Sequence, residues 1–219
     1  MLDAPAPIHD TLLDEALAAR SPRARIWEPQ GPLVVLGRSN QAARECDLEA
    51  CRVLDVPVVG RRGGGGAVVL LPGMLVVTLA GPSGSSLDAR ALFRRVNSHL
   101  AAVLSDLGVA GLRHEGISDL GLGERKVLGS SLALRRGWAL YQGSLLVDCD
   151  PTPITRLLRH PSREPAYRRG RSHAEFLTTL ARAGYPLSAG AVRRALAARL
   201  DPQTVAALTS GRPGEARCA

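Results

Sequence analysis

Four consecutive glycines preceded by two arginines form the stretch of this sequence that is best suited to bind an anion. Arg61 and Arg62 stand directly before residues 63–66, and a valine-containing run lies on each side. A backbone without Cβ atoms lets amide groups approach a ligand closely, and the two guanidinium groups add fixed positive charge. A plain hairpin turn is the alternative interpretation, because glycine-rich turns are common. With its arginines, the pattern favours two strands joined by a loop that contacts an anionic group.

The usual nucleotide-binding loops do not fit this stretch. It matches neither G-x-G-x-x-G nor G-x-x-x-x-G-K-[ST], the two glycine patterns that introduce a phosphate-binding helix. The residues that follow the glycines, 67–71, have the pattern of a strand instead of a helix. An anion bound here would therefore be held by a loop between two strands.

Lysine is nearly absent from this chain, and its single occurrence is informative. Among 28 lysine and arginine residues, Lys126 is the only lysine. An exposed surface charge accepts either residue, whereas a tight site that needs a compact ammonium group with three donors does not accept a planar guanidinium. The alternative is that one lysine persisted by chance. Because Lys126 lies in a strand-like stretch over residues 116–131, we take it as the candidate catalytic cation.

The periodicity of apolar residues predicts an α/β (α+β) arrangement around these two stretches. Pro72 and Gly73 predict a hairpin between two of the expected strands, and residues 135–137 predict a turn. One domain over residues 1–200 and a loose tail over residues 201–219 are expected. Helices are expected over residues 11–20, 48–54 (capped by Asp47), 85–107, 174–183 and 188–200, and further strands over 32–37, 67–71, 74–80 and 138–147.

Composition limits the possible classes of protein. With 219 residues, of which 45% are hydrophobic, the chain is long enough for one sizeable core. The net charge of +8 is compatible with nucleic acid, an acidic protein partner or an anionic substrate. Aromatic residues make up only 3% of the chain, so the stacking platforms of a single-strand nucleic-acid binder are scarce. We therefore expect a protein or small-molecule partner and no nucleic acid.

Neither a membrane span nor an exported, disulfide-rich protein is predicted. No apolar run approaches the roughly 18 residues of a membrane-spanning helix, and the first ten residues lack the features of a signal peptide. Cys46, Cys51, Cys149 and Cys218 show no C-x-x-C spacing. We therefore expect a cytoplasmic protein with buried or free thiols and no membrane partner.

Three ordered blocks of the sequence resemble the lipoate–protein ligase A family, which is related to biotin–protein ligases and octanoyl transferases. Residues 61–68 resemble its R-R-x-S-G-G-G-A-V signature, with Gly63 in place of the serine, and Lys126 falls on the lysine of a second signature, D/N-R-K followed by G-S or G-N. Residues 37–41 resemble a G-R-x-Q/N turn, and Gln142 replaces the histidine of an H-G-[ST]-L-L block. The resemblance implies a mixed β-sheet flanked by helices, like the biotin and lipoate ligase catalytic domains.

The resemblance also implies roles for individual residues. In relatives, the lysine contacts the acyl carbonyl and a phosphate, so Lys126 is expected to be catalytic, and Asp119 falls on an acidic position associated with metal, here Mg²⁺. ATP and Mg²⁺ are the implied co-substrate and ion, without a permanently bound cofactor. The residues expected to bind the acyl group or the nucleotide are Arg61, Arg62, Gly63, Gly64, Gly65, Gly66, Ala67, Gly37, Arg38, Gly129, Ser130, Gly143 and Ser144.

The implied function is an ATP-dependent lipoate–protein ligase. Such an enzyme activates lipoate or octanoate as an acyl-adenylate and transfers it to a lysine of an acidic lipoyl-carrier domain. One alternative is a transferase that takes an octanoyl or lipoyl group from acyl carrier protein or another lipoylated protein. Those relatives use a cysteine thioester, yet residues 111–118 and 160–162, where a thiol is expected, contain no cysteine.

A second alternative is a homologue that binds an acyl ligand or a partner without turnover. Gly63, Gln142 and the pair at residues 70–71, which replaces a His-Asp, motivate it, whereas retention of Lys126 argues against it. Many ligases of the family carry an additional C-terminal domain that assists adenylation. We expect no such domain here, so a separate accessory protein or a preformed acyl group would have to replace it.

A run of basic residues over 156–173 could mark a contact surface. It holds several arginines and two histidines, with Tyr167 in the middle and no aspartate. Residues 165–173 resemble a P-x-Y-R-x-x-R-S-H stretch of a bacterial subgroup of the same family. A solvated face is the ordinary interpretation, and a surface for an acidic partner or for nucleotide phosphates is the alternative.

Overall fold

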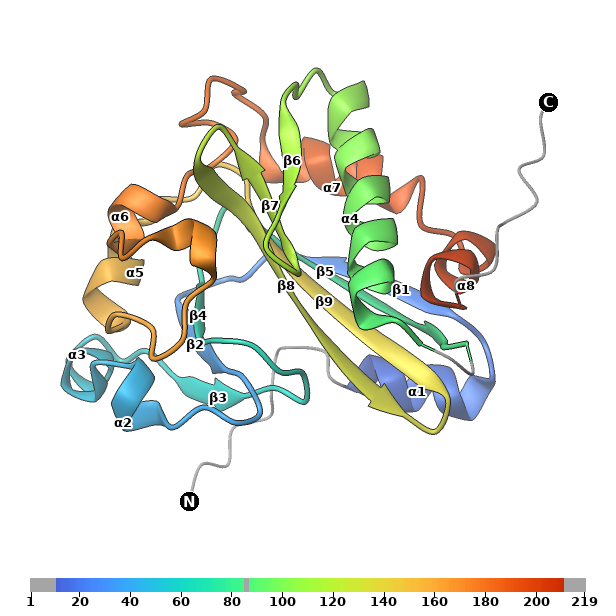
Figure 1. Cartoon of the computed structure of the whole chain (residues 1–219), viewed down its shortest axis with the longest axis horizontal. Helices are drawn as coiled ribbons and strands as arrows, with labels where there is room; N and C mark the ends of the chain where they lie inside the picture. Colours follow the sequence, from blue (N-terminus) through green and yellow to red (C-terminus); the bar gives the residue numbers. More distant parts are fainter. Residues whose placement is uncertain (1–10, 85–86, 211–219) are drawn as a thin grey trace.

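Two β-sheets form the framework of the protein in the computed structural model, which describes residues 11–84 and 87–210 (Figure 1). The large sheet is antiparallel, in the order β1 (Arg23–Trp27), β5 (Met74–Pro82), β9 (Trp138–Leu146), β8 (Arg125–Arg135), β7 (Asp119–Leu122) and β6 (Leu112–Glu115). The small sheet has the order β3 (Val58–Gly60), β2 (Leu33–Leu36) and β4 (Val68–Leu70); β2 is parallel to β3 and antiparallel to β4. The expected mixed α/β fold is confirmed.

Strand β5 organises the large sheet because it is buried on both faces. Alternate side chains of a strand point to opposite faces. Leu75, Val77 and Leu79 belong to the main core, which helices cover on one face of the sheet (Figure 1). Those helices are α4 (Ala89–Asp106), α7 (Ala189–Ala197) and α8 (Pro202–Ser210).

The opposite face of the large sheet is covered in two parts. Leu12 and Leu13 of α1 (Thr11–Ala19) pack against Ala80 and Leu140. Met74 and Val76 of β5 pack instead with the small sheet, two short helices, α3 (Leu48–Val53) and α5 (Thr152–Leu157), and Cys46, which directly follows α2 (Ala42–Glu45). The small sheet therefore faces the large one across a shared apolar layer.

Several local expectations are confirmed by the structure. Asp47 caps α3, where its carboxylate accepts a hydrogen bond of 2.9 Å from the Ala50 amide. Asp88 caps α4 in the same way, so this helix begins at Ala89; the earlier start expected at residue 85 includes residues 85 and 86, which lie outside the described residues. The short turn between β8 and β9 also forms as expected, with Gly137 at φ 74°.

The predicted hairpin across Pro72 and Gly73 is wrong. Strand β4 pairs with β2 in the small sheet, while β5 pairs with β1 on one edge and β9 on the other. A strand buried on both faces is typical of the middle of a sheet, and both edges of β5 are occupied. The Pro72-Gly73 turn therefore carries the chain from one sheet to the other.

Two further expectations about the C-terminal part are corrected. The helix expected over residues 174–183 is short, α6 (His173–Phe176), because Thr178 and the residues after it donate their amides to carbonyls of β8 and the end of β9 instead of continuing the helix. Threonines at residues 178 and 179 also favour helix poorly. In the range expected to be a loose tail, α8 forms and buries Val205 against the large sheet; residues 211–219 lie outside the described residues.

The thiol and membrane expectations can be compared with the described residues. Cys46, Cys51 and Cys149 are buried free thiols, as expected, and Cys218 lies outside the described residues. Within residues 11–84 and 87–210, no helix has the length and apolar character needed to cross a membrane.

Candidate functional site

A cavity of about 990 Å³ lies between the large sheet and the small sheet. Its lining combines an apolar surface with a group of polar side chains, an arrangement that suits a ligand with an apolar chain and a charged head. The apolar part comes from Val35, Val69, Leu70, Met74, Val76 and Leu146. The polar part includes Ser118, Asp119, Lys126, Ser130 and Ser144.

The glycine loop forms one wall of this cavity, and Arg61 holds it in shape. The Arg61 guanidinium donates hydrogen bonds of 2.7 Å and 2.8 Å to the carbonyls of Gly64 and Gly66. Gly65, between them, has φ 92°, a conformation that favours glycine. Arg61 therefore fixes the loop and also lines the cavity, and its direct contact with an anion stays a prediction.

Arg62 turns away from the cavity and forms an ion pair of 2.7 Å with Asp14 of α1. Gly37, by contrast, lies directly under the loop: a Cβ atom there would collide with the Gly65 carbonyl. The turn at residue 37 thus lets the loop pack closely against the small sheet.

Lys126 reaches into the same cavity from β8. Its ammonium Nζ lies 3.0 Å from Oδ1 of Asp119 on β7, and its side chain is 23% exposed. A Cβ atom at Gly129 would lie 2.5 Å from this Nζ, so the absence of a side chain at residue 129 makes room for the ammonium. The position of the Lys126 ammonium therefore gives a structural reason for a glycine at residue 129.

The Asp119 carboxylate is engaged on both oxygens. Oδ1 contacts Lys126, and Oδ2 accepts a hydrogen bond of 2.7 Å from the Tyr167 hydroxyl. Within the described residues, no group of three or more metal-ligating His, Cys, Asp or Glu side chains comes together. Mg²⁺ is bound through carboxylates and substrate phosphates. One carboxylate that is already paired with an ammonium does not fit a magnesium site made by the protein alone.

Residues 164–177, which we call the strap, lie beside Asp119 and Lys126. Arg168 and Arg171 brace it reciprocally, because the Nε of each donates a hydrogen bond of 2.9 Å to the carbonyl of the other. Both guanidinium groups lie over the ring of Phe176, at 4.9 Å and 5.4 Å from its centroid. The basic run expected to be a surface is therefore partly structural.

Charge and burial set the state of two further groups. Burial, together with the positive charges of Arg168, His160 and Lys126, lowers the pKa of His173 in the cavity lining to about 4, so its imidazole is neutral at pH 7. Burial and the nearby Asp148 raise the pKa of the Cys149 thiol to about 12. A thiol with so high a pKa is a poor nucleophile at neutral pH.

The structure brings most, but not all, of the predicted site residues together. The cavity is lined by Arg61, Gly65, Gly66, Ala67, Asp119, Lys126, Gly129, Ser130, Gly143 and Ser144. Gly37, Arg38, Arg62, Gly63 and Gly64 are not among its lining residues. Gly63 packs instead against Ser131 of β8, where an added Cβ would lie 2.8 Å from the Ser131 hydroxyl.

Sequence reasoning missed one polar corner of the cavity. Glu45 is 4% exposed and accepts a hydrogen bond from the Ser162 hydroxyl, and both residues line the cavity. Ser39, Asn40 and Gln41 line it nearby. The turn at residues 37–41 is the sequence signal for Ser39, Asn40 and Gln41, whereas the contact between Glu45 and Ser162 joins residues 117 positions apart in the sequence.

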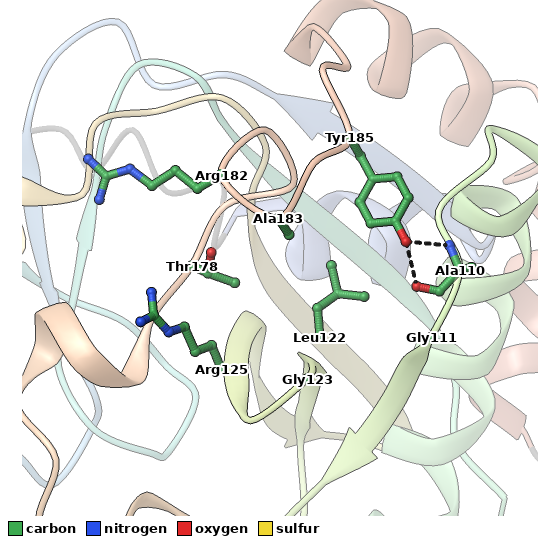
Figure 2. A pocket seen from close by; sticks show the side chains of 9 residues that line it. All are labelled: Ala110, Gly111, Leu122, Gly123, Arg125, Thr178, Arg182, Ala183 and Tyr185. Atoms are coloured by element: carbon green, nitrogen blue, oxygen red, sulfur yellow. Dashed lines mark hydrogen bonds between the residues drawn. The ribbon is translucent and has the colours of Figure 1, made fainter.

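A second, smaller cavity of about 400 Å³ opens beside the start of β8 (Figure 2). Arg125 lines it, whereas Lys126 lines the large cavity. The Tyr185 hydroxyl, also in its lining, accepts a hydrogen bond of 3.2 Å from the Ala110 amide and donates one of 3.0 Å to the Ala110 carbonyl (Figure 2). None of the predicted site residues lines this cavity.

Comparison of the sequence with known proteins finds relatives that act on lipoate or octanoyl groups. A protein of Aeropyrum pernix named as a candidate lipoate-protein ligase A is 33% identical over 151 residues, which are 69% of this chain and 56% of that relative. The octanoyltransferase LipM of Symbiobacterium thermophilum is 28% identical over 243 residues, covering 91% of this chain and 83% of the relative. The chain thus spans little more than half the length of the first of these relatives.

Solved structures of lipoate ligases share the fold. A bi-partite lipoate protein ligase of Thermoplasma acidophilum, described with its E2 lipoyl domain, has a TM-score of 0.74 at 24% identity and covers 90% of this chain and 79% of its own. A lipoate-protein ligase A bound with ATP has a TM-score of 0.72 at 22% identity, covering 86% and 76%. The sequence-family model of the lipoyl protein ligase A/B catalytic domain matches residues 6–201 of this chain. The chain therefore belongs to that family.

Proposed function

We propose that this protein is a lipoate–protein ligase that activates lipoate or octanoate with ATP and transfers the acyl group to a lysine of a lipoyl-carrier domain. The observation that carries the proposal is the position of the chain's single lysine. Its ammonium lies in a cavity that also has an apolar wall and a glycine loop, at a place where Gly129 leaves room for it. The reaction needs one compact cation close to an apolar tunnel, and this cavity supplies both.

The residues of the cavity suit the two halves of that reaction. In the first half, the carboxylate of the acid attacks the α-phosphate of ATP and pyrophosphate leaves; in the second, the carrier lysine attacks the acyl carbonyl and AMP leaves. Negative charge grows on phosphate and carbonyl oxygens in both steps, and a preorganised ammonium and backbone amides stabilise such charge. Lys126 is the cation, Gly65 and Gly66 present the loop backbone, and the apolar wall binds the acyl chain.

The second candidate is an octanoyl or lipoyl transferase. Its support is the similarity to octanoyltransferase LipM over 91% of this chain. A transferase that uses a thioester needs a reactive thiol near Lys126. Cys46, Cys51 and Cys149, the cysteines of the described residues, do not line the cavity, and burial raises the pKa of each thiol. This favours the ligase.

The third candidate, a binder without turnover, is disfavoured by the intact pairing of Lys126 and Asp119.

The partners follow from the reaction. We assign an acidic lipoyl-carrier domain as the acceptor, ATP with Mg²⁺ as the co-substrate, and a separate accessory protein as a possible subunit, since a Thermoplasma acidophilum relative is named subunit 1 of its ligase. We propose the cytoplasm as the location of this reaction. Exposed arginines near the strap suit an acidic acceptor: Arg156, Arg159, Arg163 and Arg169.

The central experiment measures exchange of labelled pyrophosphate into ATP with lipoate and, separately, with octanoate. Acid-dependent exchange is expected, followed by modification of an acidic lipoyl domain. Transfer from octanoyl acyl carrier protein without ATP would replace the ligase by the transferase. Neither activity, in the presence of a bound acid detected by calorimetry, would support the binder.

Docking of the acceptor has its own measurement. Complementary charge chiefly raises association rates and is screened by salt, with a screening length well below about 10 Å at 0.3 M ionic strength. Transfer at limiting acceptor is therefore expected to slow as salt rises from about 0.05 to 0.3 M. An unchanged rate would mean that the exposed arginines form a solvated face only.

A further inference from the structure

A chain of three polar contacts links the strap to the ammonium of Lys126. The Tyr167 hydroxyl donates a hydrogen bond of 2.7 Å to Oδ2 of Asp119, and Oδ1 of the same carboxylate lies 3.0 Å from Nζ of Lys126. Asp119 is 7% exposed, so its carboxylate has little water to replace a lost protein partner. A charge-assisted hydrogen bond to a buried carboxylate is strong and directional. The orientation of Asp119 therefore depends on Tyr167.

Tyr167 itself is held on several sides. Its ring packs against the Phe176 ring at a centroid distance of 5.1 Å. The Arg171 guanidinium donates hydrogen bonds of 2.8 Å to the Tyr167 carbonyl and, from its other terminal nitrogen, to the Glu124 carbonyl in the turn between β7 and β8. Backbone and ring are thus both fixed relative to the strands that carry Asp119 and Lys126.

The chemical state of the phenol suits a donor. Burial and the adjacent Asp119 carboxylate raise the pKa of Tyr167 far above its ordinary value, so the hydroxyl keeps its proton throughout the physiological pH range. The direction of the hydrogen bond is consequently fixed, with Tyr167 as donor and Asp119 as acceptor. Tyr167 thus occupies one oxygen of the Asp119 carboxylate, and the other oxygen faces Lys126.

We propose that Tyr167 is a positioning residue of the acyl-transfer site, which holds Asp119 so that Asp119 aims the Lys126 ammonium into the cavity. This inference rests on the proposed function for its kinetic consequence, and on geometry alone for its structural one. Tyr167 touches neither the acyl group nor the phosphate in this scheme. Its effect reaches the reaction through the carboxylate and the ammonium.

Tyr185 provides a matched control within the same chain. It is also a partly buried tyrosine whose hydroxyl makes two hydrogen bonds, but its partners are the amide and carbonyl of Ala110 beside the small cavity (Figure 2). Tyr167→Phe and Tyr185→Phe therefore remove the same atom from two comparable places. Only the first is expected to change the environment of Lys126.

The first experiment needs no enzymatic activity. Because Lys126 is the only lysine, incorporation of ¹⁵N-lysine into an untagged chain gives a single side-chain NMR signal. Hydrogen exchange of its Nζ protons, measured at one pH and temperature, is expected to be at least about threefold faster in Tyr167→Phe, because a mobile carboxylate protects the ammonium less. Tyr185→Phe is expected to match the wild type. Equal exchange in wild type and Tyr167→Phe would overturn the inference.

Asp119→Asn supplies a second variant that keeps the shape of the side chain and removes its charge. It should accelerate exchange at least as much as Tyr167→Phe, and adding Tyr167→Phe to it should produce no further acceleration. A purely structural role of Tyr167 predicts a different result, namely that the two changes add. Additive effects would therefore overturn the inference even if Tyr167→Phe alone folds poorly.

The second experiment measures acyl transfer. Tyr167→Phe is expected to lower kcat about tenfold, the scale of one hydrogen bond to a charged group, while KM for the acid and for ATP stays within about twofold of wild type. A change confined to KM would overturn the positioning role. If the wild type shows no acyl transfer at all, the proposed function fails, whereas the exchange of the Lys126 protons still decides the inference.

Discussion

The two cavities beside the start of β8 differ in what surrounds their cations. Arg125 and Lys126 are consecutive residues, and because successive side chains of a strand point to opposite faces, one lines the small cavity and the other the large one. Around Lys126, a carboxylate lies at 3.0 Å and a glycine leaves the space that the ammonium fills. Arg125 is exposed. Two adjacent positive charges thus have different requirements, and only the enclosed one demands a compact ammonium.

The largest expected effect comes from exchanging the two cations. Lys126→Arg places a planar, wider group in the space shaped by Gly129, and loss of one preorganised electrostatic contact costs about 10²–10³ in rate. We expect acyl transfer to fall by at least about two orders of magnitude with unchanged thermal stability. The reciprocal change, Arg125→Lys, should leave activity within about twofold, as for a surface charge. Initial rates and melting curves test both variants. An active Lys126→Arg variant would show that the large cavity, like the small one, accepts a guanidinium group.

Gly129→Ala tests the space beside Lys126 without changing any charge. The added Cβ would lie 2.5 Å from Nζ, so the ammonium must move, and a displacement of about 1 Å at a reacting group can cost about a hundredfold. A loss between about tenfold and a hundredfold in kcat is expected. Gly60→Ala is the matched control, since an added Cβ there meets nothing within 4 Å. Equal activity of the two alanine variants would contradict the packing argument.

The two arginines before the glycines allow a smaller comparison within the large cavity's wall. Arg61→Ala removes the donors to the Gly64 and Gly66 carbonyls, so the loop loses its shape and KM for the acid should rise about tenfold. Arg62→Ala removes a partly exposed ion pair with Asp14, which contributes at most about 1 kcal/mol to stability. Steady-state kinetics and urea unfolding separate the two effects, and equal KM values would show that Arg61 does not support the loop.

The smallest expected effect concerns thiols. With a pKa of about 12, only about one Cys149 thiol in ten thousand is ionised at pH 8, and burial restricts access to it. Treatment with iodoacetamide at pH 8, in a Cys218→Ser background, should leave Cys46, Cys51 and Cys149 unmodified by mass spectrometry and activity unchanged. Inactivation that tracks modification of one of these cysteines would favour a thioester route instead.

The sequence predicted the fold class and several of the residues that line the large cavity, but not the contacts that hold them in place. Lys126 stood out by composition, whereas Gly129 and Ser130 were identified by their resemblance to a family signature, and all three line the large cavity. The ion pair of Arg62 could not be predicted from the sequence, because its partner Asp14 lies 48 positions away. Periodicity marks a strand but carries no information about which strand pairs with it.

The same limit explains the errors in the fold. Both β4 and β5 were recognised as strands, yet their hairpin was wrong because β5 pairs with β1 and β9, which lie far from it in the sequence on either side. Thr178 and Leu180 lie within the expected helix, but their amides donate to carbonyls of β8 and β9 instead. Tertiary hydrogen bonding and the low helix propensity of threonine both end the helix there.

The backbone of Lys126 is held on two edges by segments from different parts of the chain. On one edge it pairs with Gly121 of β7, and on the other it forms a bridge with Leu177, while its carbonyl accepts a hydrogen bond of 3.0 Å from the Thr178 amide. During synthesis, which proceeds from the N-terminus, β7 and β8 can pair as a local hairpin long before residues 177 and 178 exist. The second edge of this strand, at Lys126, therefore has no partner until residues 177 and 178 have been synthesised.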